Sequence, residues 1–276
     1  MKMSYATMMV QVDVNGELDG RVRLAAKLAD RFQSQLIGIS AWMPRPPFTI
    51  EGVTIDPVLT AADLKERSAA LNRRGEEFKA AVGIDGRRVD WRCSQEFPTE
   101  YIAREARAAD LVVISRERNV YDPYVFPDPG ALVLRSGRPI LAVPPGVDSL
   151  KGQRVVVAWK DSREARRAIQ DALPFLHQAD EVIVTEVCES SEVNDCQKRL
   201  RDVAQYLARH RINAVAERAR PVEGTAENSL LRIVQDESAD LIVAGAYGRS
   251  RLGEWIFGGM TQSLLTKSPV CCLFSH

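Results

Sequence analysis

Short apolar runs alternate along the chain with longer segments in which apolar residues recur at helical spacing. Residues 154–158 form a nearly continuous apolar run, which is typical of a strand buried on both faces. Ser162 then has the place of a helix N-cap, and Glu164 stands in the first turn of that helix. Further strands are predicted at 181–188, 214–219, 241–244 and 270–273, with amphipathic helices between them, one of them over 225–237. This alternation indicates a parallel sheet covered on both faces and doubly wound by right-handed crossovers.

Two segments of the chain occur twice at the same distance. Residues 110–115 (DLVVIS) resemble 240–245 (DLIVAG), and residues 137–143 (GRPILAV) resemble 267–273 (KSPVCCL). Both pairs lie 130 residues apart, which indicates an internal duplication. The predicted fold class is therefore α/β, with two Rossmann-like domains that are each a five-stranded parallel sheet flanked by helices.

The N-terminal segments of the two copies are separated by more residues than the later segments are. Residues 8–12 (MMVQV) resemble residues 155–159 (VVVAW), 147 positions later, so the first copy holds about 17 extra residues. A Pro-rich stretch over 43–57 has no partner in the second copy and accounts for them. The turn-rich segment 144–149 (PPGVDS) marks the boundary between the copies. We expect an N-terminal domain at 1–146 and a C-terminal domain at 150–276.

Composition excludes several classes of protein. Basic and acidic residues balance at 37 each, so no overall field attracts nucleic acid or an anionic membrane. The N-terminal segment lacks the features of a signal peptide, and no apolar run has the length of a membrane span. The five cysteines are scattered, with no Cys-x-x-Cys, and the three histidines lie far apart, so no metal site is expected. Buried, unpaired cysteines suit a reducing cytoplasm, which is the expected location.

A glycine-rich segment follows the predicted strand at 241–244. Gly245 and Gly248 allow a tight turn and a close approach of the backbone to a ligand. Gly258 and Gly259 stand where a helix begins, and the free amides of a helix N-terminus attract anions. In a doubly wound sheet, ligands bind beyond the carboxyl ends of the strands near the switch point, which favours this turn as a phosphate site. Glycines that serve only to make turns remain the alternative explanation.

The spacing Gly-x2-Gly-x9-Gly of Gly245, Gly248 and Gly258 resembles the nucleotide motif of the universal stress protein family. Residues 159–165 (WKDSREA) and 172–176 (ALPFL) also resemble segments of its tandem two-domain members. The resemblance extends over essentially the whole chain. It implies two domains of the adenine nucleotide alpha hydrolase-like type, with ATP or another adenine nucleotide as the ligand and magnesium as an open option.

By position, the resemblance also implies the residues of the site. Two departures from the family pattern weaken it: Gly259 stands where a Ser or Thr is usual, and Lys160 stands where an Asp faces the adenosine. Lysine cannot accept a hydrogen bond from a ribose or an adenine amino group. The implied contacts are Gly245, Gly248, Arg249, Gly258, Gly259, Met260 and Thr261 for the phosphates, with Ala158, Lys160 and Val187 at the ends of the first two strands.

The first copy has the opposite pattern. Asp13 keeps the first-strand acid, but the segment after Ser115 is rich in prolines and keeps one glycine, Gly130, so we expect no phosphate cradle there. Asp13 is then interpreted as a turn or cap residue, and Trp159 and Tyr247 as packing residues.

The sequence holds no P-loop, no nucleophile elbow and no evident general base or catalytic residue. The predicted function is therefore a regulatory or stress-response nucleotide binder, with slow ATP hydrolysis at most. The alternative is an interaction or scaffold module with a decayed site. The resemblance further implies an intrachain pseudo-dimer joined through the fifth strands, and a homodimer of chains is compatible with it.

Overall fold

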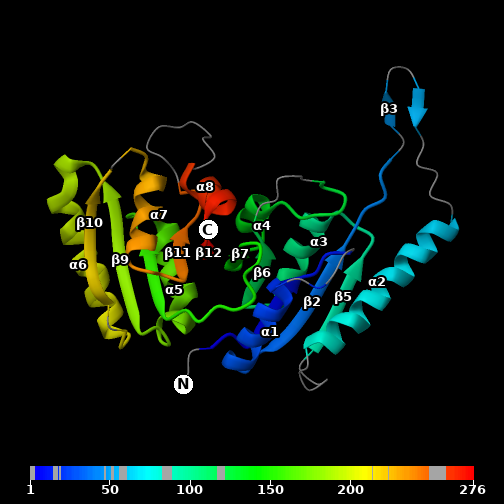
Figure 1. Ribbon diagram of the computed structural model, residues 1–276, viewed down its shortest axis with the longest axis horizontal. Coiled ribbons are helices and arrows are strands. Elements are labelled where there is room, and N and C mark those ends of the chain that lie inside the picture. The colour runs from blue at the N-terminus through cyan, green and yellow to red at the C-terminus, as the bar shows by residue number, and fades with distance from the viewer. Residues whose placement is uncertain are drawn as a thin grey trace.

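The computed structural model describes residues 4–14, 18, 20–46, 48–50, 53–55, 61–82, 89–116, 122–212, 214–222, 224–248 and 259–276. A ten-stranded sheet runs through the molecule in the order β10-β9-β8-β11-β12-β7-β6-β1-β2-β5 (Figure 1). The first half contributes β1 (Thr7–Gln11), β2 (Gln35–Ala41), β5 (Val89–Ser94), β6 (Leu111–Ser115) and β7 (Ile140–Val143). The second half contributes β8 (Arg154–Ala158), β9 (Glu181–Cys188), β10 (Ala214–Pro221), β11 (Leu241–Gly245) and β12 (Cys271–Ser275).

Within each half, all neighbouring strands of this sheet are parallel, which confirms the predicted five-stranded parallel sheets. The halves meet at β7 and β12, which pair antiparallel with Leu141 opposite Leu273. Two strands of the second half have the predicted bounds, 154–158 and 181–188. The fifth lies one to two residues later than predicted, because its ladder with β11 continues to Ser275.

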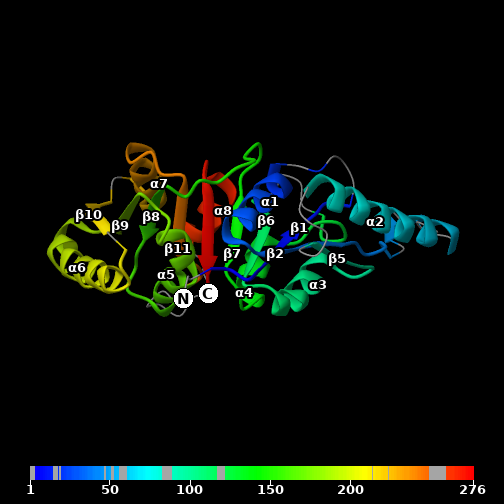
Figure 2. The same ribbon diagram turned by 90° about the horizontal axis from the view of Figure 1, so that it is seen from below.

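Helices cover both faces of the sheet. One face carries α1 (Gly20–Phe32), α2 (Ala61–Val82), α5 (Arg163–Leu176) and α6 (Val193–Arg209). The other carries α3 (Pro98–Glu105), α4 (Pro129–Arg135), α7 (Ala226–Asp236) and α8 (Gly259–Lys267), with the short 3-10 turns η2 (Ala106–Ala108) and η3 (Ser190–Glu192) elsewhere in the chain. Figure 2 shows α5 and α6 below the sheet in one half and α1 and α2 above it in the other, because the twist accumulates over ten strands.

The core consists of two apolar layers, one on each face, and both continue through the two halves. In β8, Val155 and Val157 enter the layer beneath α5 while Val156 enters the opposite layer, which explains the continuous apolar run. Ser162 caps α5 as predicted, since its hydroxyl accepts a 3.3 Å hydrogen bond from the Ala165 amide. Thr225 caps α7 in the same way.

The Pro-rich insertion of the first half contains a hairpin between β2 and α2. Its strands, β3 (Phe48–Ile50) and β4 (Val53–Ile55), pair antiparallel and project from the body of the molecule (Figure 1). The described residues of the second half hold no such hairpin. Among the described helices, none is both long and apolar enough to cross a membrane.

Candidate functional site

The glycine turn of the second half lies at the switch point of its strand order. The chain passes from β8 to β9 on one side, whereas β11 lies on the other side of β8. Ala158 at the end of β8 is paired with Ala244 of β11 and with Thr185 of β9. Ala158, Val187 and Gly245 therefore stand along one carboxyl edge, which is where ligands bind in doubly wound sheets. The helix after the turn, α8, begins at Gly259 as predicted.

Gly245 has a packing role in the structure. A Cβ at this position would lie 2.4 Å from the amide nitrogen of Ala165 and 2.6 Å from the carbonyl carbon of Glu164. Both atoms belong to the backbone of the first turn of α5, so they have little room to move. The missing side chain thus permits close packing of β11 against α5, which is a role for Gly245 besides the predicted contact with a ligand.

Tyr247 holds the turn in place. Its backbone has a left-handed φ of 54°, and its amide donates a 3.3 Å hydrogen bond to Oγ1 of the buried Thr261. The Tyr247 hydroxyl lies 2.5 Å from the point where a Cβ on Gly130 would stand, at the start of α4 in the first half. Tyr247 therefore acts as a packing residue, as predicted, and it couples the turn to the first half of the molecule.

Two carboxylates border the turn. Oε2 of Glu164 lies 3.1 Å from the point where a Cβ on Gly248 would stand, and Oε1 of Glu227 lies 2.9 Å from the equivalent point on Gly259. Glu164 is 3% exposed. Burial acts to raise the pKa of Glu164, but hydrogen bonds from Arg163, the Glu164 amide and Ser162 lower it below its ordinary value, so the group is ionised. Sequence reasoning missed both carboxylates as neighbours of the turn.

The other residues predicted to contact the nucleotide differ in how far they are exposed to solvent. Lys160 is exposed, and no acid among the described residues forms an ion pair with it. Val187 and Met260 are half-buried against the apolar layer beneath α7 and α8, and Ala158 lies on the same layer. Arg249 and Gly258 lie outside the described residues.

The same edge of the first half is filled by a polar cluster. Arg21, the second residue of α1, is 3% exposed and donates hydrogen bonds to the side chains of Gln11 and Ser115. It also lies 3.4 Å from Oδ1 of Asp13, which accepts a further 2.7 Å bond from Gln11. The Asp13 carbonyl oxygen accepts a 3.0 Å hydrogen bond from the buried Arg74. Asp13 thus binds internal partners, in keeping with a structural role.

A separate hollow of about 390 Å³ lies between α5 and α6. Its lining combines apolar and aromatic groups with charged groups of both signs: Trp159, Asp161, Arg166, Ile169, Gln170, Arg199, Asp202, Val203 and Tyr206. None of the predicted site residues lines it. No group of three or more His, Cys, Asp or Glu side chains in the described ranges is placed to hold a metal ion.

Comparison with known proteins gives a family match for the second half. Residues 152–274 match the model of the universal stress protein family. Over the whole chain, the structure is similar to a universal stress protein from Archaeoglobus fulgidus DSM 4304, with a TM-score of 0.68, 17% identity, and coverage of 98% of this chain and 96% of that one. A putative universal stress protein from Pseudomonas aeruginosa UCBPP-PA14 is also similar, with a TM-score of 0.63, 17% identity, and coverage of 98% and 92%.

A functionally unknown protein from Pseudomonas aeruginosa PAO1 gives the same TM-score of 0.63 at 16% identity, with coverage of 98% and 92%. No curated protein matches the chain in sequence. The structural likenesses show a shared fold over both halves, and the family match covers the C-terminal half. Residues 152–274 thus match the universal stress protein family, and for the rest of the chain the solved structures show a shared fold.

Proposed function

We propose that the chain is a regulatory universal stress protein that binds an adenine nucleotide in its second half. The proposed domains are 1–146 and 150–276, joined as an intrachain pseudo-dimer through β7 and β12. The proposed contacts are Ala158, Lys160, Val187, Gly245, Gly248, Arg249, Gly258, Gly259, Met260 and Thr261. A cytoplasmic location, an optional magnesium ion and a further dimer of chains belong to the same proposal.

The difference between the two carboxyl edges carries this proposal. In the first half, the side chains of Gln11, Arg21 and Ser115 bind one another and fill the edge. In the second half, the positions of Gln11 and Ser115 are taken by Ala158 and Gly245, which have little or no side chain. The second half therefore has fewer side-chain atoms at its switch point, and we place the ligand there, although the space beside Gly245 itself is taken by the backbone of α5. Binding rather than turnover is the proposed activity, because the sequence holds no P-loop, no nucleophile elbow and no evident general base.

The competing hypothesis is a scaffold or interaction module whose site has decayed. Two observations favour it. The exposed Lys160 stands where the resemblance implies an Asp, and the carboxylates of Glu164 and Glu227 lie beside the glycines that would hold the phosphates. Nucleotide binding is preferred because the small residues along the edge and the helix N-terminus at Gly259 remain in place.

Calorimetric titration of the full chain with adenosine, AMP, ADP and ATP tests the proposal. We expect saturable binding of at least one ligand at a stoichiometry of one per chain. Gly248→Asp adds bulk and negative charge at the turn and is expected to abolish it. Asn194→Asp is the control, because it adds one negative charge at an exposed position on α6, away from the turn. Absence of heat with all four ligands at millimolar concentration would sink the proposal, and unchanged affinity in Gly248→Asp would place the site elsewhere.

A further inference from the structure

The hollow between α5 and α6 lies on the other face of the sheet from two of the residues proposed to contact the nucleotide. Its apolar lining comes from Trp159, Ile169 and Val203, which belong to the layer beneath α5 and α6. Val187 and Met260 pack against the opposite layer. The volume of about 390 Å³ falls within the roughly 300–1,000 Å³ that small-molecule sites occupy. The hollow is therefore a candidate site that shares no residue with the proposed nucleotide site.

The equivalent place in the first half holds a buried arginine. The buried positions of α2 and α6 have the same spacing, so that Leu71, Gly75, Phe78 and Val82 match Cys196, Leu200, Val203 and Leu207. This match makes Arg74 the equivalent of Arg199. Arg74 is 6% exposed, and its Nε donates a 3.0 Å hydrogen bond to the carbonyl oxygen of Asp13, just beyond β1. In the first half, a guanidinium therefore lies between the second helix and the end of the first strand.

Arg199 has a different partner. Its guanidinium donates hydrogen bonds of 2.7 and 3.2 Å to the carboxylate of Glu186 on β9. The strand register places Ser40 of β2 at the position of Glu186. A serine has no carboxylate with which to hold an arginine. Glu186 therefore keeps Arg199 at the side of the hollow, and the space beside the end of β8 stays open.

Aromatic rings line two parts of the hollow. Trp159 is 9% exposed, and its indole N–H is buried without an acceptor among the described residues. Tyr206 adds a second ring, which is half-buried. Aromatic side chains pack favourably against the rings of a ligand, and a buried donor without an acceptor costs free energy. A ligand that combines aromatic rings with an acceptor oxygen fits both features.

Both arginines of the hollow already have carboxylate partners. Arg166 binds Asp161, and Arg199 binds Glu186. An anionic ligand would compete with these carboxylates for the arginines, and a cationic ligand would compete with the arginines for the carboxylates. Asp202 is exposed, so water and salt screen its attraction for a cation. An uncharged ligand disturbs neither pair and loses least when it leaves water.

We propose that this hollow binds an uncharged two-ring aromatic molecule that carries a hydroxyl or carbonyl oxygen. The rings of the ligand pack against Trp159 and Tyr206, and its oxygen accepts a hydrogen bond from the indole N–H of Trp159. Glu186 is a positioning residue, because it acts through Arg199. This proposal does not depend on nucleotide binding in the same half.

Calorimetric titration of the full chain with 2-naphthol tests the proposal. We expect saturable binding at one site per chain, about tenfold tighter than that of 2-naphthoate or 2-naphthylmethylamine, which are charged compounds of similar size. Excess AMP should not displace 2-naphthol. The proposal is overturned by absence of saturable binding, by tighter binding of either charged compound, or by displacement with AMP.

Two substitutions test the part played by Glu186. Glu186→Ser gives the second half the residue of the first and frees Arg199 to close the hollow, so the affinity for 2-naphthol should fall about tenfold. Adding Arg199→Ala removes the closing side chain and should restore the affinity. Asp195→Asn is the control, because it changes an exposed residue of α6. Equal affinities in Glu186→Ser and Asp195→Asn, or no recovery in the double variant, would overturn the proposal.

Trp159→Phe gives a test that does not require Glu186→Ser to fold. It keeps an aromatic ring in the hollow but removes the indole N–H, so the affinity for 2-naphthol should fall about fivefold. An affinity equal to that of Asp195→Asn would show that the ligand does not bind at Trp159.

Discussion

The hydroxyl of Tyr5 donates a 2.6 Å hydrogen bond to the carbonyl oxygen of Asp171 and so joins the first half of the chain to the second. Around this bond, the ring of Tyr5 packs against Phe32 and Phe175, with centroid distances of 5.3 and 5.7 Å. Phe32 and Phe175 also meet edge to face at 5.1 Å. The two halves are therefore joined by a buried aromatic contact as well as by the pairing of β7 with β12.

Tyr5→Phe removes this hydrogen bond while keeping the aromatic contact. Because Tyr5 is 4% exposed, the loss is expected to lower the free energy of unfolding by about 1 kcal/mol. Urea denaturation of the full chain measures the change. Tyr206→Phe is the matched control, since within the described part of the chain the Tyr206 hydroxyl makes an exposed 3.5 Å contact with Gln170. Equal effects of the two substitutions would show that the bond between the halves contributes nothing of its own.

Local patterns in the sequence predicted the elements well. The strand at 154–158, the cap at Ser162 and the start of α8 follow from apolar runs, capping side chains and glycines that act over a few residues. The parallel sheets also followed, because strands that alternate with helices leave few other arrangements. The boundary between the domains and the ligand contacts stay predictions.

Long-range neighbours at the site were not predicted. Arg21 and Ser115 are 94 residues apart, and nothing in the local pattern of either residue indicates the other. Glu164 was interpreted only as an acid in the first turn of its helix. That interpretation is correct, but it did not predict that the Glu164 carboxylate lies beside Gly248. Arg21 and Glu164 are each the second residue of the helix that follows the first strand, and they carry opposite charges. The sequence does not align them, because the loop between β1 and α1 is longer than the one between β8 and α5. Gly245 shows the same problem, because its backbone neighbours on α5 depend on the packing of the whole half.

Arg21→Met tests the polar cluster of the first half. The substitution keeps much of the side-chain volume but leaves Asp13, Gln11 and Ser115 without their central donor. Breaking a buried ion pair in this way is expected to cost about 3–5 kcal/mol in the free energy of unfolding. Arg23→Met is the control, since Arg23 is exposed and makes a 3.8 Å contact with Asp148. A urea midpoint for Arg21→Met close to that of Arg23→Met would contradict the structural role of the cluster.

The cysteines differ sharply in access to solvent. Cys196, Cys271 and Cys272 are at most 1% exposed, and burial raises the pKa of Cys196 and of Cys272 to about 12. A thiol is nucleophilic as its thiolate, so these groups are expected to be inert at neutral pH. Cys93 is half-exposed. A disulfide reagent added to the native protein should modify Cys93 first, which gives a fast phase in the time course of thiol modification. Cys93→Ser should remove this fast phase. A fast phase that survives Cys93→Ser would show that the buried sites open readily.

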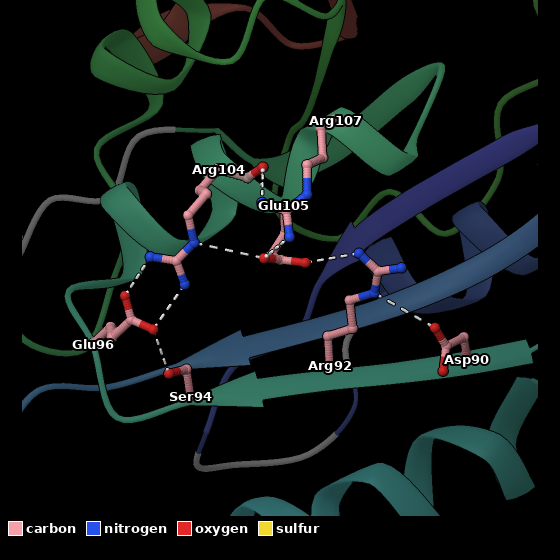
Figure 3. Close-up of polar contacts among 7 residues, drawn as sticks. All are labelled: Asp90, Arg92, Ser94, Glu96, Arg104, Glu105 and Arg107. Atoms are coloured by element: carbon pink, nitrogen blue, oxygen red, sulfur yellow. Dashed lines mark hydrogen bonds and ion pairs between the residues drawn. The ribbon is translucent and has the colours of Figure 1, made fainter.

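Acid should weaken the contact of Glu96 with Arg104 (Figure 3). Arg104 donates bonds of 2.6 and 2.8 Å to Glu96, and Ser94 donates one of 2.7 Å. These bonds lower the pKa of Glu96 from 4.5 to about 2. Because the folded-state pKa is the lower one, the contribution is complete above pH 4.5 and is lost as the pH falls toward 2.

Glu96→Gln is therefore expected to reduce the slope of stability against pH within this window. Ser94→Ala should give an intermediate slope, since it removes one of the three bonds. The effect is small because both charged groups are exposed to solvent. Urea midpoints measured from pH 2 to 5 test it, and parallel curves for the three proteins would refute the assigned cause.

Two glycines of the candidate site allow a last comparison. Gly245→Ala places a methyl group against the backbone of Ala165 and Glu164, which cannot yield without moving α5. Gly259→Ala places the same group 2.9 Å from Oε1 of Glu227, the end of a flexible side chain that can rotate away. We expect Gly245→Ala to cost about 1–3 kcal/mol in the free energy of unfolding and Gly259→Ala to stay within about 0.5 kcal/mol. Urea denaturation measures both. Equal losses in the free energy of unfolding would mean that the contact with α5 does not require glycine at position 245. The presence of Gly245 would then be explained by ligand binding alone.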